Sequence, residues 1–509
     1  MHKNIYFFVP GKTMANGVLK GSKKDLLCMN EKVYLQKHFI KLEKNCQCVF
    51  GLFPRKFGNF PGKAFPFFCI NPKSAFFSWL SRVKSRPSLF NSQFIHKIKI
   101  YFPYTNLLYF LERRDFSVGN FQKRDTFIPY NVPDITDAEI NEEVDTLRSG
   151  WLAKGPKTLE FEKRFAAYLG AKHAVAVNSC TAALHVALLS QDIGPGDEVI
   201  TTPMTFASTA STILHTGATP VFADIDYRTG CIDPAEIEKK ITSRTRAIVP
   251  VHYSGQVCDL DRIYEIADEH GLFVSEDAAH ALWSRYKGRL IGNGLRGTAS
   301  YSFYATKNLC TGEGGMLVTD RDDIADRARI LTSHGMSRNA WNRYAKGGSW
   351  KYDIVEPGFK YNMFDMQAAL GLHQLERLED MQARRLRIAA RYQEAFVPMD
   401  ALDMPEVPEY ATHCWHLYVM RIRPEMLTID RDQFIVELNE RNVGTSVHFI
   451  PVHLMSAYRN RFGYQEGDFP NTEKHFERII SLPLYPTMTD EEVQYVIDAV
   501  QDIVEKYHK

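Results

Sequence analysis

The sequence predicts an α/β fold with a mainly parallel central sheet, followed by a smaller C-terminal α+β domain. Between residues 173 and 320, short apolar segments alternate with amphipathic segments of helical length. Near-continuous apolar strands that alternate with helices are typical of parallel sheets covered on both faces. Reactive or polar residues follow directly after several of the predicted strands, where sheets of this class bind their ligands.

The predicted strands and helices of this region follow one another in regular order. Small residues and glycines separate them, as expected for the loops of α/β units. The expected strands are 174–177, 198–201, 220–223, 247–251, 272–275, 300–303 and 316–318, and the expected helices are 182–190, 206–215, 234–241 and 259–269.

Two amphipathic helices are expected before the first strand, over 134–149 and 158–169. Asp137 is the expected N-cap of the first helix, in which Ile140, Val144 and Leu147 share one face. Gly150 and Gly170 are expected to end the two helices, because glycine adopts the left-handed conformation at a helix C-terminus.

The C-terminal part is predicted to be a separate small domain, over residues 373–509, after a large domain that spans 126–372. A long helix from 365 to 387 is expected to lead into it. The expected elements that follow are strands at 413–422 and 444–449 and helices at 431–441, 472–480 and 490–506.

Residues 1–125 differ in composition from the rest of the chain. The first 130 residues hold 22 of the 62 Lys and Arg but only 6 of the 60 Asp and Glu, and they hold 19 of the 33 Phe. Such a segment can be a nucleic-acid or membrane-binding arm, or a transit-type leader. We favour a third interpretation, in which 1–125 is a disordered extension or lies upstream of the true start.

Several classes of protein are excluded by the composition. The nine cysteines include no pairs with zinc-ligand spacing and no disulfide framework, so neither a metal site nor an oxidising compartment is expected. No apolar run is long enough for a membrane helix. We therefore expect a cytoplasmic protein that does not span a membrane. Because the interpretation favoured for 1–125 gives this basic segment no binding role, no nucleic-acid partner is expected either.

Lys307 stands just after the predicted strand 300–303 and before a glycine-rich turn. A lysine at the end of a buried strand has a lowered pKa, because burial disfavours its charged form. This cost is tolerable where the amine works as a nucleophile, as in Schiff-base enzymes. The alternative, an ordinary surface lysine, is disfavoured by the other strand-end residues.

Three other strand-end features suit a phosphorylated ligand with a nitrogen-containing ring. The turn at 178–181 joins a strand to a helix through small residues, so its backbone N–H groups can bind an anion; a plain N-cap by Ser179 or Thr181 is the alternative. Asp277 ends another strand and can hold a protonated ring nitrogen, or else simply cap a helix. Phe206 follows a third strand and can cover a ring.

Together these residues meet the requirements of pyridoxal 5′-phosphate (PLP). The cofactor needs a lysine, a carboxylate at its pyridine nitrogen and a phosphate site. A metal site is not supported, because the histidines near Asp277 lack ligand-like spacing.

The chain from about residue 127 onward resembles the DegT/DnrJ/EryC1/StrS family of PLP-dependent nucleotide-sugar aminotransferases, which have fold type I. Within the family it is similar to enzymes that aminate UDP-4-keto sugars, such as the UDP-4-amino-4-deoxy-L-arabinose aminotransferases. The resembling segments are SGW (149–151), GP (155–156), SCTAALH (179–185), GPGDEVI (194–200), GATPV (217–221), VHYSG (251–255), EDAAH (276–280), 302–315 and GFKYN (358–362).

The resemblance implies a role for each matching residue. Lys307 is the implied catalytic residue, which carries the Schiff base and moves the proton during amine transfer. The implied cofactor-binding residues are Asp277 at the ring nitrogen, His280 near the phenolic oxygen, Phe206 over the ring, and Cys180, Thr181 and Ser302 at the phosphate, with Asn362 reaching the phosphate of a neighbouring subunit in a homodimer. Relatives carry Gly or Ala where this chain has Cys180.

The implied reaction is transfer of the amino group of L-glutamate, through PLP, to a nucleotide-linked 4-keto sugar. A UDP-linked sugar is expected; a dTDP-linked keto-hexose is the alternative acceptor. A non-catalytic regulatory protein with a basic N-terminal arm is the alternative of another class, which the intact Asp277 and Lys307 disfavour. Candidates for contacts with the diphosphate are Arg338, Lys346, Lys360 and His448.

Overall fold

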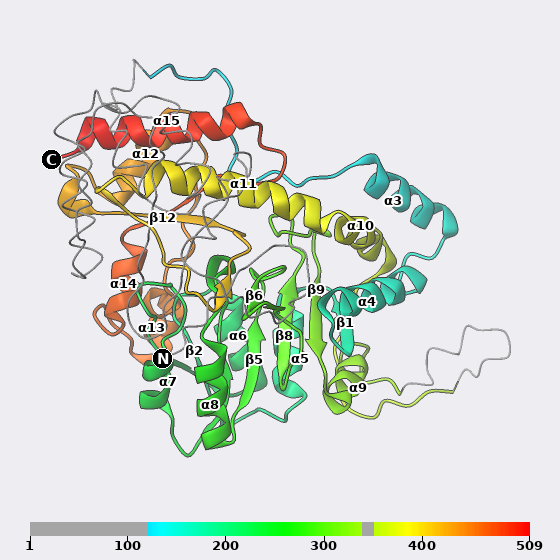
Figure 1. Ribbon diagram of the computed structural model, residues 1–509. Coiled ribbons are helices and arrows are strands. Elements are labelled where there is room, and N and C mark those ends of the chain that lie inside the picture. Colours follow the sequence, from blue (N-terminus) through cyan, green and yellow to red (C-terminus); the bar gives the residue numbers. More distant parts are fainter. Residues whose placement is uncertain (1–120, 338–350) are drawn as a thin grey trace, which may run out of the picture. The chain divides into compact units, whose positions relative to one another are not determined.

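A seven-stranded sheet lies at the centre of the structure (Figure 1). The computed structural model describes residues 121–337 and 351–509. The sheet consists of β1 (His173–Val177), β2 (Glu198–Thr201), β3 (Thr219–Phe222), β4 (Thr245–Val249), β5 (Phe273–Asp277), β8 (Thr298–Ser302) and β9 (Gly315–Thr319). Its order is β1-β9-β8-β5-β4-β2-β3, and β9 runs antiparallel to both of its neighbours while the other pairs are parallel. The predicted fold class is confirmed.

Helices cover both faces of this sheet, because its strands are apolar on both sides. In β1, Ala174 and Ala176 belong to one core cluster, and Val175 and Val177 belong to another on the opposite face. The first face is covered by α4 (Pro156–Leu169) and α8 (Leu260–His270), and the second by α5 (Cys180–Leu189), α6 (Ala207–Thr216) and α9 (Asp322–Leu331).

A smaller antiparallel sheet follows in the C-terminal part. It has the order β10-β12-β13 and shares one core cluster with the helices that cover it. Its strands are β10 (Leu402–Asp403), β12 (Tyr418–Ile422) and β13 (Ile479–Leu482), and its helices are α11 (Leu378–Phe396), α12 (Arg431–Glu440) and α15 (Asp490–Tyr507). Figure 1 shows α12 and α15 side by side above this sheet.

Several further strands and helices are short. A third sheet, β11-β6-β7, lies in the loops beside the large sheet. These elements are β6 (Arg285–Tyr286), β7 (Arg289–Leu290), β11 (Ala411–Thr412), α7 (Pro234–Lys240), α13 (Ser456–Phe462) and α14 (Pro470–Phe476).

Three of the predictions for the C-terminal part are wrong in whole or in part. The strand expected at 413–422 begins only at Tyr418, as β12. The expected strand at 444–449 is an irregular segment in which Ser446 alone makes a bridge, to Ser481. The helix expected at 472–480 ends at Phe476, and the following apolar residues form β13 instead. A short apolar run fits either a helix or a buried strand, and here pairing with β12 decides for the strand.

The long helix expected at 365–387 is two helices, α10 (Asp365–Glu376) and α11, which meet at Arg377. Arg377 leaves the helical conformation, with φ −98° and ψ 3°. Its guanidinium bonds Asp134 and Glu139, which lie just before and within the first turn of α3 (Asp137–Ser149). The break thus comes from a tertiary contact that helical periodicity does not reveal.

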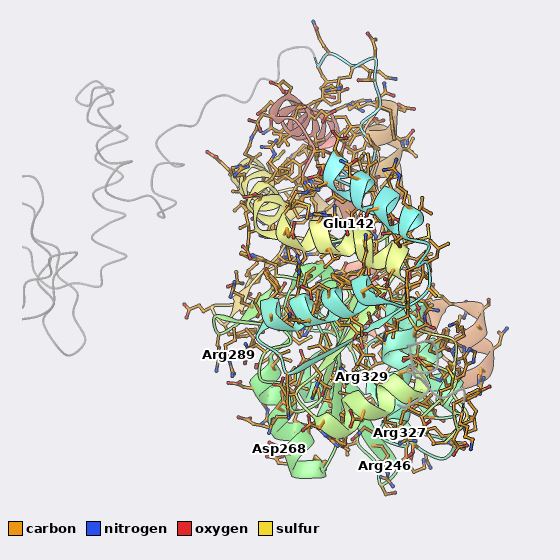
Figure 2. All side chains as sticks on the ribbon, turned by 90° about the vertical axis from the view of Figure 1, so that its right-hand side faces the viewer. Glu142, Arg246, Asp268, Arg289, Arg327 and Arg329 are labelled. Atoms are coloured by element: carbon orange, nitrogen blue, oxygen red, sulfur yellow. The ribbon has the colours of Figure 1, made fainter. Side chains whose placement is uncertain are left out.

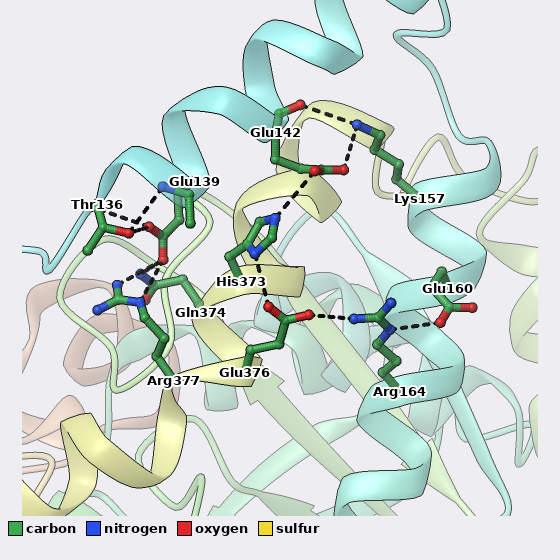
Figure 3. Close-up of polar contacts among 11 residues, drawn as sticks. Thr136, Glu139, Glu142, Lys157, Glu160, Arg164, His373, Gln374, Glu376 and Arg377 are labelled. Atoms are coloured by element: carbon green, nitrogen blue, oxygen red, sulfur yellow. Dashed lines mark hydrogen bonds and ion pairs between the residues drawn. The ribbon is translucent and has the colours of Figure 1, made fainter.

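Helix α3 (Asp137–Ser149) docks on α10 through polar side chains (Figure 3). Its N-cap is Thr136, which forms a capping box with Glu139, so the prediction of Asp137 as the cap is wrong. Burial alone would raise the pKa of Glu139, but hydrogen bonds from Thr136 and Arg377 lower it to about 2. The face expected to be apolar, by contrast, is open: Ile140 is 52% and Leu147 is 54% exposed.

Two buried aspartates cap helices that lie far away in the sequence. Asp365 accepts hydrogen bonds from the N–H groups of Gly155, Lys157 and Thr158 and from the Thr158 hydroxyl, at the start of α4. Asp224 accepts hydrogen bonds from the N–H groups of Asn471 and Thr472 and from the Thr472 hydroxyl, at the start of α14. Both helices begin with Gly-Pro or Phe-Pro and lack a side-chain cap of their own.

Asp365→Ala is expected to lower the free energy of unfolding by about 2 kcal/mol, because an N-cap contributes roughly 0.5–2 kcal/mol and buried N–H groups lose their acceptor. Urea denaturation of the purified protein measures the change. Asp137→Ala is the matched control, because Asp137 is exposed and makes no cap, and we expect a change below about 0.5 kcal/mol. Equal losses in the two variants would contradict the capping role.

Candidate functional site

The predicted site residues meet at one edge of the large sheet. β1, β5 and β8 point in one direction, so their carboxyl ends lie together. The turn at 178–181 follows β1, Asp277 ends β5, and Lys307 follows β8 by five residues. The structure therefore places the expected amine, carboxylate and anion-binding turn at the same edge.

Asp277 is a buried carboxylate without an ion pair among the described residues. It is 4% exposed, whereas charged side chains such as Arg246, Asp268 and Arg289 lie on the outer surface (Figure 2). Its two oxygens accept hydrogen bonds from the Thr209 hydroxyl, at 2.8 Å, and from the Ala279 N–H, at 3.1 Å. Burial raises the pKa of Asp277, against the effect of these bonds and of the Lys307 charge.

Lys307 lies in an environment that favours a neutral amine. Burial lowers its pKa to about 8, and the nearby Asp277, Cys180 and Cys414 only partly offset this effect. No hydrogen bond or ion pair holds its Nζ among the described residues. About a tenth of this amine is therefore unprotonated, and nucleophilic, at pH 7, far more than for a lysine with its usual pKa.

In the protein without cofactor, the reactivity of Lys307 is expected to rise with a midpoint near pH 8, because deprotonation of a lysine with a lowered pKa occurs at lower pH. Competitive acetylation by acetic anhydride, read by peptide mass spectrometry, measures this titration. In Asp277→Asn the midpoint should fall further, because the carboxylate that favours the ammonium is removed. A wild-type midpoint near 10.5 would show that the amine is exposed to water.

The turn after β1 leads into the N-terminus of α5. Ser179 caps the helix by accepting from the Ala182 N–H at 3.1 Å, while the N–H groups of Cys180 and Thr181 find no acceptor among the described residues. The Cys180 thiol turns inward to the Ser300 carbonyl, 3.5 Å away, and burial raises its pKa. A thiol in place of Gly or Ala is thus accommodated, with its N–H still available.

Ser302 and Gly315 lie beside this turn. They pair directly across β8 and β9. A Cβ atom on Gly315 would lie 2.5 Å from the backbone carbon of Ser179, so only glycine allows the strand to pass this close to the turn. The arrangement brings the Ser302 hydroxyl to the same corner as the free N–H groups.

Another wall of the site comes from the loop before α6, which contains Phe206, and from the segment after α12, which contains His448 and Phe449. Phe206 is 62% exposed, and its ring lies 5.9 Å from that of Phe449. The ring of Phe449 also stacks on His280 at 5.8 Å. His448, a candidate for diphosphate contacts, is bonded to Ser481, and burial with the Lys307 charge lowers its pKa to about 4.

Asn362 lies beside the end of β1 of its own chain. It makes an antiparallel bridge with Val177, and its side chain donates to the Met363 carbonyl at 3.0 Å. Lys360 is exposed, and its carbonyl accepts from the Asn178 side chain at 3.3 Å. Arg338 and Lys346, the other two candidates for the diphosphate, lie outside the described residues.

Three residues of the site are absent from the sequence predictions. Thr209 donates to Asp277 and accepts from Thr205, whose Oγ1 is 2.7 Å away. Cys414 and His416 lie near Lys307, as their electrostatic interactions with it show. Thr209 lies one helical turn after Phe206, a spacing that could have revealed it; the other two come from a distant part of the chain, and no local signal marks them.

The residues present fit PLP. Asp277 is a buried carboxylate that forms no ion pair within the described part of the chain, so it can be the partner of a protonated ring nitrogen. The free N–H groups of Cys180 and Thr181 at a helix N-terminus suit a phosphate. Lys307 offers an amine with a lowered pKa at the same edge. His280, whose pKa burial lowers, stays neutral beside them.

Comparison with known proteins gives one family. Residues 133–501 match the model of the DegT/DnrJ/EryC1/StrS aminotransferase family. The spore coat polysaccharide biosynthesis protein SpsC of Bacillus subtilis is 58% identical over 384 residues, which cover 75% of this chain and 98% of that protein.

Solved structures agree with this match. The PLP form of the putative sugar aminotransferase Spr1654 of Streptococcus pneumoniae has a TM-score of 0.70 and 37% identity, over 75% of this chain and 99% of the other. PseC of Helicobacter pylori, an aminotransferase of pseudaminic acid biosynthesis, has a TM-score of 0.69 and 28% identity, over 75% of this chain and all of the other.

Proposed function

This chain belongs to the DegT/DnrJ/EryC1/StrS aminotransferase family, and we propose that it transfers the amino group of L-glutamate to a nucleotide-linked 4-keto sugar. The chain is a PLP-dependent sugar aminotransferase of fold type I, as predicted. The observation that carries the proposal is the convergence of Lys307, Asp277 and the α5 N-terminus at one edge of the sheet. The expectation of an enzyme is confirmed, and the regulatory alternative is set aside.

Each residue of the site has a task in this proposal. PLP, when bound, supplies an electron sink that lets an amino group be exchanged. Lys307 anchors the cofactor and its Nζ moves the proton between carbon atoms. Asp277 keeps the ring nitrogen protonated, while Thr209 and the Ala279 N–H hold the carboxylate in place.

The phosphate and the ring have their own binding residues in the proposal. The N–H groups of Cys180 and Thr181 and the Ser302 hydroxyl bind the phosphate. Phe206 covers one face of the ring, and His280 lies near its phenolic oxygen. His280 accepts from the Ser254 N–H through Nδ1, at 3.2 Å, so its neutral form carries the proton on Nε2 and can donate there.

We propose a UDP-linked acceptor. Support comes from the resemblance to UDP-4-keto-sugar enzymes, and from two relatives whose names place them in polysaccharide and pseudaminic acid biosynthesis. Turnover with L-glutamate on a panel of UDP- and dTDP-linked 4-keto sugars tests it. A preference of at least tenfold in kcat/KM for UDP sugars supports the proposal, whereas a preference for dTDP sugars assigns the alternative acceptor.

We also propose a homodimer. Large apolar side chains are exposed just before and along α3, in the loop to α4 and in the first turn of α4, which suits an interface between subunits. They are Ile135, Ile140, Leu147, Trp151, Leu152 and Leu159. In the proposal Asn362 reaches the phosphate of the neighbouring subunit, so each site contains residues of two chains.

Mixing two inactive variants is expected to restore activity if Asn362 acts across the dimer. After subunit exchange, half of the dimers pair Lys307→Ala with Asn362→Ala, and one of the two sites in each such dimer has both residues intact. The mixture should then regain up to about a quarter of the wild-type activity per subunit. No recovery, with exchange verified by mass spectrometry, would place Asn362 at the site of its own chain.

We place the enzyme in the cytoplasm. All five cysteines of the described residues are free and buried, as expected in a reducing compartment. Within residues 121–337 and 351–509, no helix is long and apolar enough to cross a membrane. In this proposal the enzyme binds L-glutamate, a nucleotide sugar and a second subunit, and it binds no nucleic acid.

A further inference from the structure

Ser254 lies in the short turn after β4 with a backbone conformation that serine rarely adopts. It is 3% exposed and has φ 59° and ψ −1°, in the left-handed region. A side chain makes this region unfavourable, so a residue other than glycine stays there only where its surroundings hold it. Because such strain is concentrated at functional sites, the contacts of Ser254 bear on the function.

Three hydrogen bonds, one to each polar group of the residue, hold Ser254 in place. Its N–H donates to Nδ1 of His280 at 3.2 Å, and its carbonyl accepts from the Leu417 N–H at 3.1 Å. Its hydroxyl oxygen lies 3.3 Å from Nε2 of His413. His280 belongs to the candidate site, whereas Leu417 and His413 come from the segment before β12. This segment therefore holds Ser254, and Ser254 in turn holds His280.

The proton of His413 is placed by a turn in its own segment. Its Nδ1 accepts from the Trp415 N–H at 2.8 Å, and the two rings stack with their centroids 4.2 Å apart. Burial lowers the pKa of His413 to about 3, so the ring is neutral. A neutral ring whose Nδ1 accepts carries its proton on Nε2, and this N–H donates to the Ser254 hydroxyl oxygen. Trp415 itself has φ 51°, so strained backbone lies on both sides of this contact.

His280 is held in one protonation form by these contacts. Burial first, and then the charges of Lys307 and His448, keep the pKa of His280 well below its usual range, so the ring is neutral. Its Nδ1 accepts from the Ser254 N–H, so its proton is on Nε2. This nitrogen has no partner among the described residues, and it is not one of the unpartnered atoms sealed from solvent. The ring therefore keeps a free N–H donor that a ligand can reach.

We propose that Ser254 and His413 are positioning residues for His280: the strained Ser254 backbone fixes the His280 proton on Nε2, and His413 maintains the strain. The inference rests on the proposed function, in which His280 lies near the phenolic oxygen of PLP, and it adds two residues to that role. A donor fixed in advance stabilises negative charge on such an oxygen without reorganisation. No proton is transferred between Ser254, His413 and His280, and no covalent bond forms or breaks.

The alternative is that the bond between His413 and Ser254 only joins the segment before β12 to the turn after β4. Two substitutions at one position separate these roles. Ser254→Ala and Ser254→Gly both remove the hydroxyl and keep the N–H. Glycine adopts φ 59° without strain, whereas alanine does not. Loss of a simple link affects both variants equally, whereas loss of the hold on a strained backbone affects only Ser254→Ala.

The main readout is the proton position on His280 in the protein without cofactor, from ¹⁵N NMR of histidine-labelled protein with His280→Gln for assignment. Wild type and Ser254→Gly should carry the proton on Nε2. In Ser254→Ala the population with the proton on Nδ1 should rise about fivefold, because Nδ1 loses its donor. With PLP and L-glutamate, the single-turnover rate should fall about tenfold in Ser254→Ala and less than about threefold in Ser254→Gly.

His413→Asn tests the second residue of the proposal. Its amide oxygen lies near the position of Nδ1 and can accept from the Trp415 N–H, but the donor to Ser254 is lost. Alone, it should lower the single-turnover rate about tenfold. In the Ser254→Gly background it should cause no further loss, because glycine needs no support in this conformation.

Equal effects of Ser254→Ala and Ser254→Gly, or an undiminished effect of His413→Asn in the Ser254→Gly background, would overturn the inference in favour of the structural role. A proton on Nδ1 of His280 in the wild type would refute it without any variant, even if Ser254→Ala fails to fold. The NMR readout needs neither cofactor nor catalysis. It therefore remains informative if Lys307→Ala proves active, a result that would instead refute the proposed function.

Discussion

Lys307→Ala is expected to lose at least about 10⁴-fold in kcat and to lose the visible absorbance band of bound PLP. The physical reason is that the variant lacks both the anchor of the cofactor and the group that moves the proton, and removal of a covalent catalyst has effects of this size. Absorbance spectra with saturating PLP and glutamate-dependent turnover measure the two losses.

The variant should fold as well as the wild type without cofactor. The Lys307 amine is held by no ion pair among the described residues, so its removal takes away a cost of burial. Lys172→Ala is the matched control, because Lys172 is exposed and its one ion pair within the described residues is with Asp322 at the surface. It should keep both absorbance and turnover. Turnover of Lys307→Ala within tenfold of wild type would refute the assignment.

Asp277→Asn is expected to lower kcat by about 10²–10⁴-fold. In the proposed function Asp277 pairs with the protonated ring nitrogen of bound PLP. Removing one partner of such a buried charge pair costs about 3–5 kcal/mol, and each 1.36 kcal/mol is tenfold in rate. Asparagine also offers an N–H group where the Thr209 hydroxyl or the Ala279 N–H now donates. The measurement is the single-turnover rate with L-glutamate at saturating PLP.

Thr209→Val provides a graded comparison. It removes one of the two donors to Asp277 but keeps the carboxylate, so a loss of about tenfold is expected, in line with one hydrogen bond to a charged group. A loss in Thr209→Val that equals or exceeds the loss in Asp277→Asn would show that the carboxylate itself is not what matters.

The large sheet was predictable because its strands are short, largely buried segments that alternate with helices. All seven predicted strands occur, with no end displaced by more than two residues. The caps were less predictable. Thr136 rather than Asp137 caps α3, and Asp365 caps α4 from 207 or more residues away. The break at Arg377 likewise depends on distant partners, which periodicity cannot show.

The site was predictable where its residues follow strands of the large sheet. Asp277, Lys307 and the 178–181 turn met this condition, since the carboxyl ends of parallel strands share an edge. His416 and Cys414 did not, because they come from the irregular segment before β12 that had been expected to be part of a strand. Their proximity to Lys307 is a product of tertiary packing alone.

Transfer of isotope tests the central claim most directly. The purified protein with PLP, L-[¹⁵N]glutamate and a UDP-linked 4-keto sugar should yield 2-oxoglutarate and a UDP-linked 4-amino sugar that carries the ¹⁵N label, as read by mass spectrometry. Lys307→Ala should yield neither product. Formation of 2-oxoglutarate without label in any nucleotide sugar, or no consumption of glutamate by the PLP-loaded wild type, would contradict the account.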